Sequence, residues 1–223
     1  MRFVVAIDGT SASGKSTTAR NVAQRLGWFF LDTGAMYRAV AYEVLRRGVD
    51  PNDFEKVAEV VQEIDIDVKP GPDGQITCVN GEDVSAYLRT PDVDKAVTPV
   101  SQNPAVRKKL VAIQRKVGKD RELVCEGRDM TTVVFPDAEL KIYMDADINV
   151  RAERRKKDLE KKGIHISLEE IKNDLMRRDF ADSNRDISPL KKADDAIELD
   201  TTNLTIEDEV NFVLERIKER LKE

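Results

Sequence analysis

The sequence has little of the chemistry on which many enzyme active sites depend. It contains one histidine, His165, and two cysteines, Cys78 and Cys125, with neither CxxC nor Cys/His spacing. We therefore do not expect chemistry that needs a histidine base or a histidine-rich zinc site. Both cysteines lie in apolar runs, which predicts buried, reduced thiols in place of a disulfide or a metal site.

Long apolar runs and an excess of positive charge are also missing. The N-terminal run becomes polar after residue 7, too early for a secretion signal, and no run reaches the length of a membrane span. The formal net charge of −5 argues against a nucleic-acid polymer as partner, and an anionic substrate would need locally placed positive charge. We expect a cytoplasmic monomer that has no membrane partner.

The 223 residues, 40% of them hydrophobic, suffice for one compact α/β domain with small insertions. Short apolar runs alternate with amphipathic segments, which predicts a parallel sheet with helices on both faces. The expected strands are about 3–8, 28–31, 122–126, 139–144 and 194–199. The expected helices are about 15–27, 35–47, 104–117, 147–162 and 167–180, followed by a final helix with one apolar face from Ile206 to Leu221.

Residues 50–99 have a different character. A short helix over 53–63 precedes two β-prone runs, 64–68 and 76–79, which are separated by the turn residues Pro70 to Gly74. Hairpin turn residues between β-prone runs predict a small antiparallel insert on the main sheet.

The strongest functional signal is a phosphate-binding loop that directly follows the first expected strand and opens a helix. It has the pattern G-x-x-x-x-G-K-S, whose backbone N–H groups and helix N-terminus bind phosphates. Lysine in this motif reaches the β- and γ-phosphates, and the serine hydroxyl faces Mg²⁺. A glycine-rich turn without a ligand is the structural alternative. The predicted ATP-binding residues are Gly9, Thr10, Ser11, Ala12, Ser13, Gly14, Lys15, Ser16 and Thr17.

Such loops also serve GTPases, motors and ATP-dependent switches. The sequence has no Asn/Thr-Lys-x-Asp motif for reading guanine, and its size favours a small-molecule kinase. Several segments then narrow the choice, namely IDGTSASGKST, LDTGAMYRA, VSQNPAVR, EGRDMTTVVFPDA, RRDFADSNR and ELDTTNLTIEDEV. Together they resemble bacterial cytidylate kinases, in order, from Val4 to about Val213.

The resemblance implies a P-loop kinase fold with a five-stranded parallel core (1–49, 100–150 and 186–223). It also implies an insert that binds the nucleoside monophosphate (50–99) and a mobile lid (151–185). The implied reaction moves the γ-phosphate of ATP, bound with Mg²⁺, to CMP or dCMP. Kinases for UMP, AMP or dTMP are the nearest alternatives, and an ATP-responsive binding module without an acceptor is a more distant one.

Arginines are the main acceptor-site candidates, because a guanidinium binds phosphate through two parallel hydrogen bonds. The resemblance implies that Arg38, Arg128 and Arg185 hold the acceptor phosphate. Asp32 would orient basic side chains around it, beside the hydroxyl of Thr33.

The resemblance also implies which residues read the base. A carboxylate can accept a hydrogen bond from cytosine N4, and an arginine can donate to N3 or O2. Asp129 and Arg107 match these roles, with a hydroxyl from Thr98 or Ser101. The alternative interpretations are that Asp129 caps a helix and that Arg107 is a solvated charge.

Further residues are implied for the ribose and for the lid. Arg178 and Asp182 match residues that hold the ribose hydroxyls, although both could be exposed charges. Arg151 and Arg154 are the lid residues expected at the transferring phosphate. Both also fit a solvated helix stabilised by i,i+4 ion pairs, such as Arg154 with Asp158. The acceptor phosphate is already ionised, so no general base is required.

Overall fold

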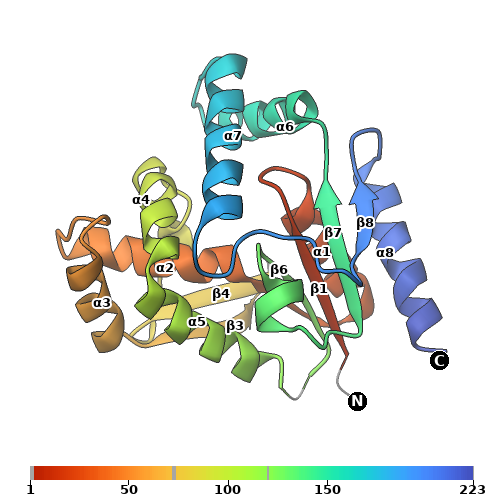
Figure 1. The fold of residues 1–223 in the computed structure, drawn as a ribbon, viewed down its shortest axis with the longest axis horizontal. Helices are drawn as coiled ribbons and strands as arrows, with labels where there is room; N and C mark the ends of the chain where they lie inside the picture. Colours follow the sequence, from red (N-terminus) through yellow and green to blue (C-terminus); the bar gives the residue numbers. More distant parts are fainter. Residues whose placement is uncertain (1–2, 72–73, 120, 223) are drawn as a thin grey trace.

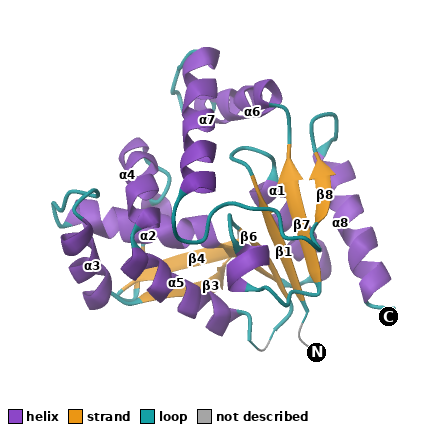
Figure 2. Cartoon of the chain, viewed as in Figure 1, coloured by secondary structure: helices purple, strands orange, loops and turns teal. Residues whose placement is uncertain are grey.

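A computed structural model describes residues 3–71, 74–119 and 121–222. Its core is a five-stranded parallel sheet in the order β2-β6-β1-β7-β8 (Figures 1 and 2). These strands confirm the predicted α/β class and sheet. Their bounds are Val4–Gly9 (β1), Phe29–Asp32 (β2), Leu123–Glu126 (β6), Leu140–Asp145 (β7) and Ile197–Asp200 (β8).

The central strand β1 is buried along its whole length and contributes to two hydrophobic cores. Successive side chains on a strand point to opposite faces, so Val4 and Ala6 enter one core while Val5 and Ile7 enter the other. Helices α2 (Thr33–Arg46) and α5 (Pro104–Val117) cover the first face, and α1 (Lys15–Leu26) and α8 (Ile206–Arg220) cover the second. Burial on both faces explains why the inner strands β1 and β6 read as apolar runs without alternation, whereas β7 alternates between buried and half-buried residues and the edge strand β8 has one buried residue, Leu199.

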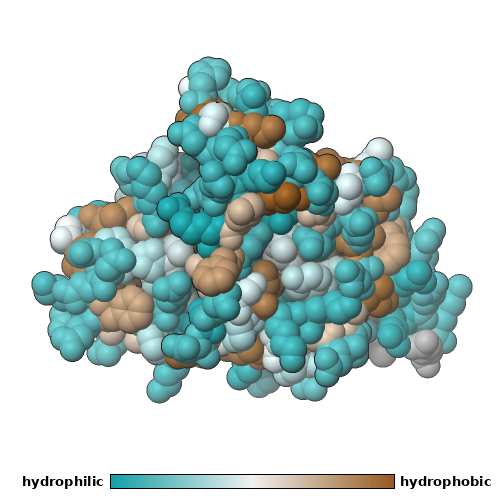
Figure 3. Space-filling model, turned by 45° about the horizontal axis from the view of Figure 1, so that its top comes forward, coloured by the Kyte–Doolittle hydropathy of each residue, from teal (hydrophilic) through white to brown (hydrophobic). Residues whose placement is uncertain are grey.

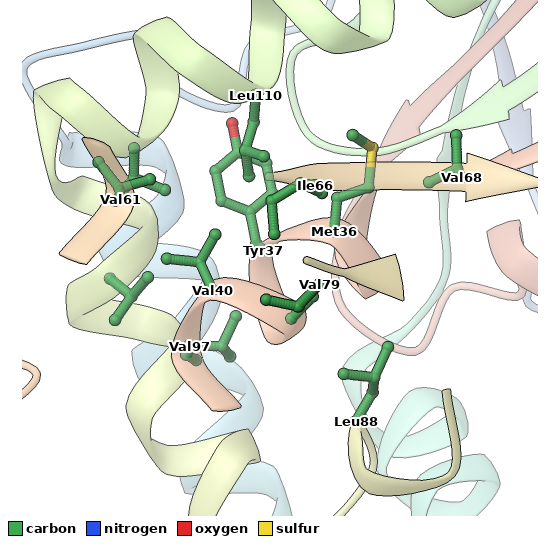
Figure 4. Close-up of a cluster of buried hydrophobic side chains, with 14 of the residues drawn as sticks. Met36, Tyr37, Val40, Val61, Ile66, Val68, Val79, Leu88, Val97 and Leu110 are labelled. Carbon is green, nitrogen blue, oxygen red and sulfur yellow. The ribbon is translucent and has the colours of Figure 1, made fainter. Parts of the chain in front are cut away.

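A separate antiparallel sheet follows α3 (Phe54–Glu63), as the hairpin signal predicted. It consists of β3 (Ile66–Gly71), β4 (Gly74–Val79) and β5 (Glu82–Asp83), in that order. Two residues of the expected turn, Pro72 and Asp73, lie outside the described residues. Figure 4 shows how this sheet packs: Ile66, Val68 and Val79 meet Met36, Val40 and Leu110 of α2 and α5. The insert thus shares the core beside α2.

One helix was not expected from the sequence. After a 3₁₀ turn (η1, Ser85–Tyr87), helix α4 covers Pro91–Gln102 although Pro99 lies inside it. A proline inside a helix removes a backbone hydrogen bond and argues against helix formation. Here Pro91 occupies the favourable first turn, the Thr90 hydroxyl caps it, and four buried apolar side chains pack against the α2 side of the core: Val93, Ala96, Val97 and Val100.

Helices α6 (Ile148–Glu160) and α7 (Leu168–Asn184) stand together at one end of the molecule (Figure 1). The predicted capping box of Ser167 and Glu170 is present at the start of α7. The helix runs four residues beyond the expected end, so Asp182 is helical and Arg185 is its C-cap. A small cluster of Ala152, Ile171 and Leu175 joins the two helices.

The face in Figure 3 is largely hydrophilic, with scattered apolar residues. Both cysteines are free and buried, as predicted. Within residues 3–71, 74–119 and 121–222, no helix is both long and apolar enough to cross a membrane.

Candidate active site

A cleft of about 900 Å³ opens at the carboxyl end of the main sheet. Loops that follow β1, β2 and β6 form its floor, and α4, α6 and α7 supply its sides. In open α/β sheets the carboxyl edge is where ligands bind. The chain is acidic overall, yet the cleft is lined by many cations, including Lys15, Arg20, Arg38, Arg89, Arg107, Arg128, Arg154, Arg155, Arg178 and Arg185.

The loop between β1 and α1 has the backbone of a phosphate cradle. Gly9 has a φ of 146°, and a Cβ there would lie 1.8 Å from the carbonyl oxygen of Met144. Gly14 has a φ of 101° and would bring a Cβ to 2.9 Å from the Glu209 carboxylate. Only glycine fits both positions. Glu209, on α8, also accepts a hydrogen bond from Thr18, so the last helix supports this loop from behind.

Lys15 and Ser16 occupy the start of α1. The Lys15 ammonium is buried and donates to the Thr10 carbonyl and, over 3.3 Å, to Ser13 Oγ. Burial, and then the charge of Arg128, lower the pKa of Lys15 to about 7. Ser16 Oγ donates to Glu126 Oε1 over 2.9 Å, and burial followed by repulsion from Asp32 raises the pKa of that carboxyl. The hydroxyl and carboxylate form a compact group of oxygen atoms beside the lysine.

Two acidic residues hold basic side chains where the cleft meets α2 and α4. Asp32 caps α2 by accepting from the Ala35 N–H, and its other oxygen lies 2.7 Å from Arg89 Nη2. Asp94 of α4 lies 3.2 Å from Arg38 Nε and 3.1 Å from Arg155 Nη2. Burial alone would raise the pKa of Asp94, but the two guanidinium groups hold it below its ordinary value.

Asp129 and Arg107 form a buried ion pair, with 3% of each side chain exposed. Arg185 Nη2 lies 3.9 Å from the other carboxylate oxygen of Asp129. The Asp129 side chain makes no cap hydrogen bond to the π-helical turn that follows it (η2, Met130–Val134), so the helix-cap alternative is wrong. Because Arg107 is buried, the solvated-charge alternative is also wrong.

This buried cluster has more donors than acceptors. Arg107 Nη1 donates to the Ser101 carbonyl over 3.3 Å. Arg107 Nε, Arg185 Nη2 and the Tyr37 hydroxyl have no hydrogen-bond partner within the described part of the chain. Thr98 and Ser101 lie on α4 beside the cluster, where Ser101 Oγ donates to the Thr98 carbonyl. Buried polar groups normally have partners, so unpaired groups here indicate a ligand subsite.

Arg128 lies between the phosphate loop and α7. Its Nη2 donates to Ser11 Oγ over 2.9 Å and its Nε to Asp182 over 2.7 Å. Arg178 lines the same cleft, and its pKa is lowered by burial and by the charges of Arg38 and Arg128. Positive charge is therefore crowded here, which favours binding of an anion.

The two arginines that were predicted for the lid occupy different environments. Arg154 Nη1 donates to Thr201 Oγ1 over 2.9 Å and lies along the cleft beside Glu209 rather than pairing with Asp158. Arg151 is buried and donates to the carbonyls of Ala146 and Ser11. The hydrogen bond from Arg151 to the Ser11 carbonyl stabilises the conformation of the phosphate loop.

Most of the predicted site residues meet in this one cleft. Within the described residues, Gly9, Thr10 and Arg151 do not line it, whereas the other candidates do. Sequence reasoning missed Arg89, Asp94, Glu126 and Arg155, which also line it. Glu126 carried a usable signal, because it is the polar end of a buried strand. Asp94 and Arg155 did not, since nothing in the sequence pairs α4 with α6.

Comparison with known proteins decides the family. The sequence model of the family described as cytidylate kinase matches residues 5–219. The chain belongs to the cytidylate kinase family. It is 43% identical over 220 residues to a cytidylate kinase of Geobacillus kaustophilus, covering 99% of this chain and 98% of that one. A cytidylate kinase of Lactobacillus johnsonii is 45% identical over 218 residues, covering 98% and 95%.

Membership in the cytidylate kinase family confirms the predicted resemblance and the predicted enzyme class, an ATP-dependent nucleoside monophosphate kinase. A crystal structure of an uncharacterized protein from Eubacterium ventriosum superposes with a TM-score of 0.52 at 13% identity, covering 98% of this chain and 99% of that one. That likeness concerns the fold alone.

Proposed function

We propose that this member of the cytidylate kinase family transfers the γ-phosphate of ATP to CMP or dCMP, giving ADP and CDP or dCDP. The observation that carries the proposal is the pairing of two subsites in one cleft. The phosphate loop and the buried Asp129–Arg107 pair with its unpaired donors line the same cleft.

On the donor side, residues 9–17 would bind ATP, with Lys15 at the β- and γ-phosphates. Mg²⁺ prefers oxygen ligands, and Ser16 Oγ with the neighbouring Glu126 carboxylate fits that preference. Ser16 would hold the ion, which neutralises phosphate charge when bound. Arg154, which is held by Thr201, would lie beside the bound ATP.

On the acceptor side, Arg38, Arg128 and Arg185 would hold the monophosphate, with Asp32 and Thr33 beside it. The ribose would lie at Arg178 and Asp182. Asp129 would accept from cytosine N4 and Arg107 would donate to N3 or O2, with Thr98 or Ser101 supplying a hydroxyl. This arrangement is supported by the placement of all these residues in one cleft.

The chemistry follows from positioning and charge. The acceptor phosphate is already ionised, so the protein has to overcome the repulsion between two phosphates and stabilise charge on the moving group. Lys15 and the arginines supply that positive charge. We infer that residues 151–185, mainly α6 and α7, act as a lid that excludes water, and that residues 50–99 form the monophosphate-binding insert.

We also infer a cytoplasmic monomer whose partners are small nucleotides and not nucleic-acid polymers. Both subsites are built from one chain, so a second copy is not required for the site. The free cysteines fit a reducing compartment, and the net charge of −5 disfavours a polyanionic polymer.

A coupled assay that follows ADP release tests the proposal with CMP, dCMP, UMP, AMP and dTMP as acceptors. We expect the highest kcat/KM for CMP or dCMP. A higher value for UMP, AMP or dTMP would assign a different acceptor. No stimulation of ATP turnover by any of them would instead indicate a binding module without an acceptor.

A further inference from the structure

Ser11, in the phosphate loop, is held by three separate parts of the chain. Its backbone N–H donates to Asp179 Oδ1 over 2.8 Å, and its carbonyl accepts from Arg151 Nη1 over 3.1 Å. Its hydroxyl accepts from Arg128 Nη2 over 2.9 Å. Two of these partners belong to the proposed lid, Arg151 on α6 and Asp179 on α7. Only 4% of Ser11 is exposed, so these contacts are shielded from water.

Asp179 and Arg151 complete a closed arrangement around that loop. The two side chains form an ion pair, with 15% and 9% of their surfaces exposed. Arg151 Nε is fixed by the Ala146 carbonyl at 2.9 Å, close to the start of α6. An ion pair with this little exposure is screened less than one at the surface. The base of the lid is therefore attached to the phosphate loop by charged hydrogen bonds.

The next turn of α7 reaches the acceptor side. Asp182 lies three residues after Asp179, so both carboxylates project from one face of the helix. Asp182 accepts from Arg128, whose guanidinium also contacts Ser11. One helix face thus touches the donor loop directly and an acceptor arginine one turn later. Asp179 is not among the described residues that line the cleft, whereas Asp182 is.

We propose that Asp179 is a positioning residue that docks α7 on the phosphate loop through the Ser11 N–H, so that the binding of ATP and the binding of CMP become energetically coupled. This inference rests on the proposed function, because it takes the loop as the donor site and Arg128 as part of the acceptor site. Asp179 touches neither substrate. Its effect passes through Ser11 and Arg151 on one side and through α7 and Arg128 on the other.

The test is a binding cycle measured by calorimetry. The dissociation constant of CMP is determined with and without a saturating non-hydrolysable ATP analogue and Mg²⁺, and the ratio is the coupling factor. We expect the wild-type protein to bind CMP at least about fivefold more tightly with the analogue present. Asp179→Ala should bring the factor close to one. Asp179→Asn, which keeps an acceptor for the Ser11 N–H but loses the ion pair, should fall between them.

Two further variants separate this role from a general loss of structure. Asp174→Asn is the matched control, because Asp174 lies on the same helix and pairs with Arg177 on the surface. It should keep the wild-type coupling factor. Ser11→Ala removes only the hydroxyl that accepts from Arg128 and leaves the hydrogen bonds of Asp179 and Asp182 on α7 in place. It should therefore lower the coupling factor although α7 is unchanged.

Steady-state kinetics supplies a second readout. Loss of docking should lower kcat for transfer more than it changes the KM for either nucleotide, and should raise ATP hydrolysis in the absence of CMP, since a poorly docked lid admits water. A coupling factor near one in the wild-type protein, or an unchanged factor in Asp179→Ala, would overturn the inference. Failure of CMP to bind the wild-type protein would instead refute the proposed function.

Discussion

Asp129→Asn tests how the protein selects its acceptor. In the wild-type protein, uracil would place its O4 acceptor against the Asp129 carboxylate and its N3–H against the Arg107 donors. Each mispaired buried group costs about 1–3 kcal/mol, so two of them predict a preference for CMP over UMP of at least about tenfold in kcat/KM. An asparagine at 129 offers an N–H₂ donor to O4. The variant should lose activity with CMP and narrow the preference, while Arg107 still opposes full reversal.

The structure also predicts a cost in stability, which the assay has to separate from specificity. Breaking a buried ion pair costs up to about 3–5 kcal/mol, and both Asp129 and Arg107 are 3% exposed. The ratio of kcat/KM for CMP and UMP, measured on one preparation, does not depend on the fraction of folded enzyme. Asp137→Asn, in the exposed loop after η2, is the control and should leave the ratio unchanged. If Asp129→Asn also leaves it unchanged, the base is read elsewhere.

Three more predictions follow from the buried charges and the lid. Bound phosphates should raise the pKa of Lys15 from about 7, so calorimetry near pH 8 should show proton uptake when ATP binds. Lys15→Ala should abolish that proton uptake and lower the activity at least about a hundredfold. Near-normal turnover of this variant would disprove the assignment of Lys15. Burial raises the pKa of Asp8 from 3.8 to about 6, so its stabilising contribution is complete below about pH 4 and lost as the pH rises through 6. In denaturant unfolding, the wild-type protein should therefore gain about 2 kcal/mol over Asp8→Asn between pH 7 and pH 4, and a constant difference would contradict this. Amide hydrogen exchange across 151–185 should slow when a bisubstrate analogue binds; unchanged exchange would exclude a lid role.

Local patterns account for the parts of the fold and site that could be predicted. The phosphate loop needs a strand, two glycines in unusual conformations and a helix start, and all of these are contiguous in the sequence. The inner strands β1 and β6 are short apolar runs because each is covered on both faces. The Ser167 capping box is equally local and was found where predicted.

The remainder depends on contacts between distant segments. Helix α4 contains Pro99, and besides the Thr90 cap and Pro91 in its first turn it is stabilised by packing against the α2 side of the core, which no local pattern reveals. Asp94 becomes part of the site because α4 carries it to Arg38 and Arg155, which come from two other helices. The position of Arg151 predicts a lid residue, but its burial against the Ser11 carbonyl could not be predicted from a run of charged residues.

The double membership of β1 has a mechanical consequence. Val4 and Ala6 belong to the core beneath α2, while Val5 and Ile7 belong to the core beneath α1. The positions of both helices are therefore fixed relative to the same strand. The spacing between the start of α1, which follows the phosphate loop, and the start of α2, which Asp32 caps, is therefore set by the sheet. Refilling either core with larger side chains would tilt one helix against the other, and substrate alignment would suffer before the protein unfolded.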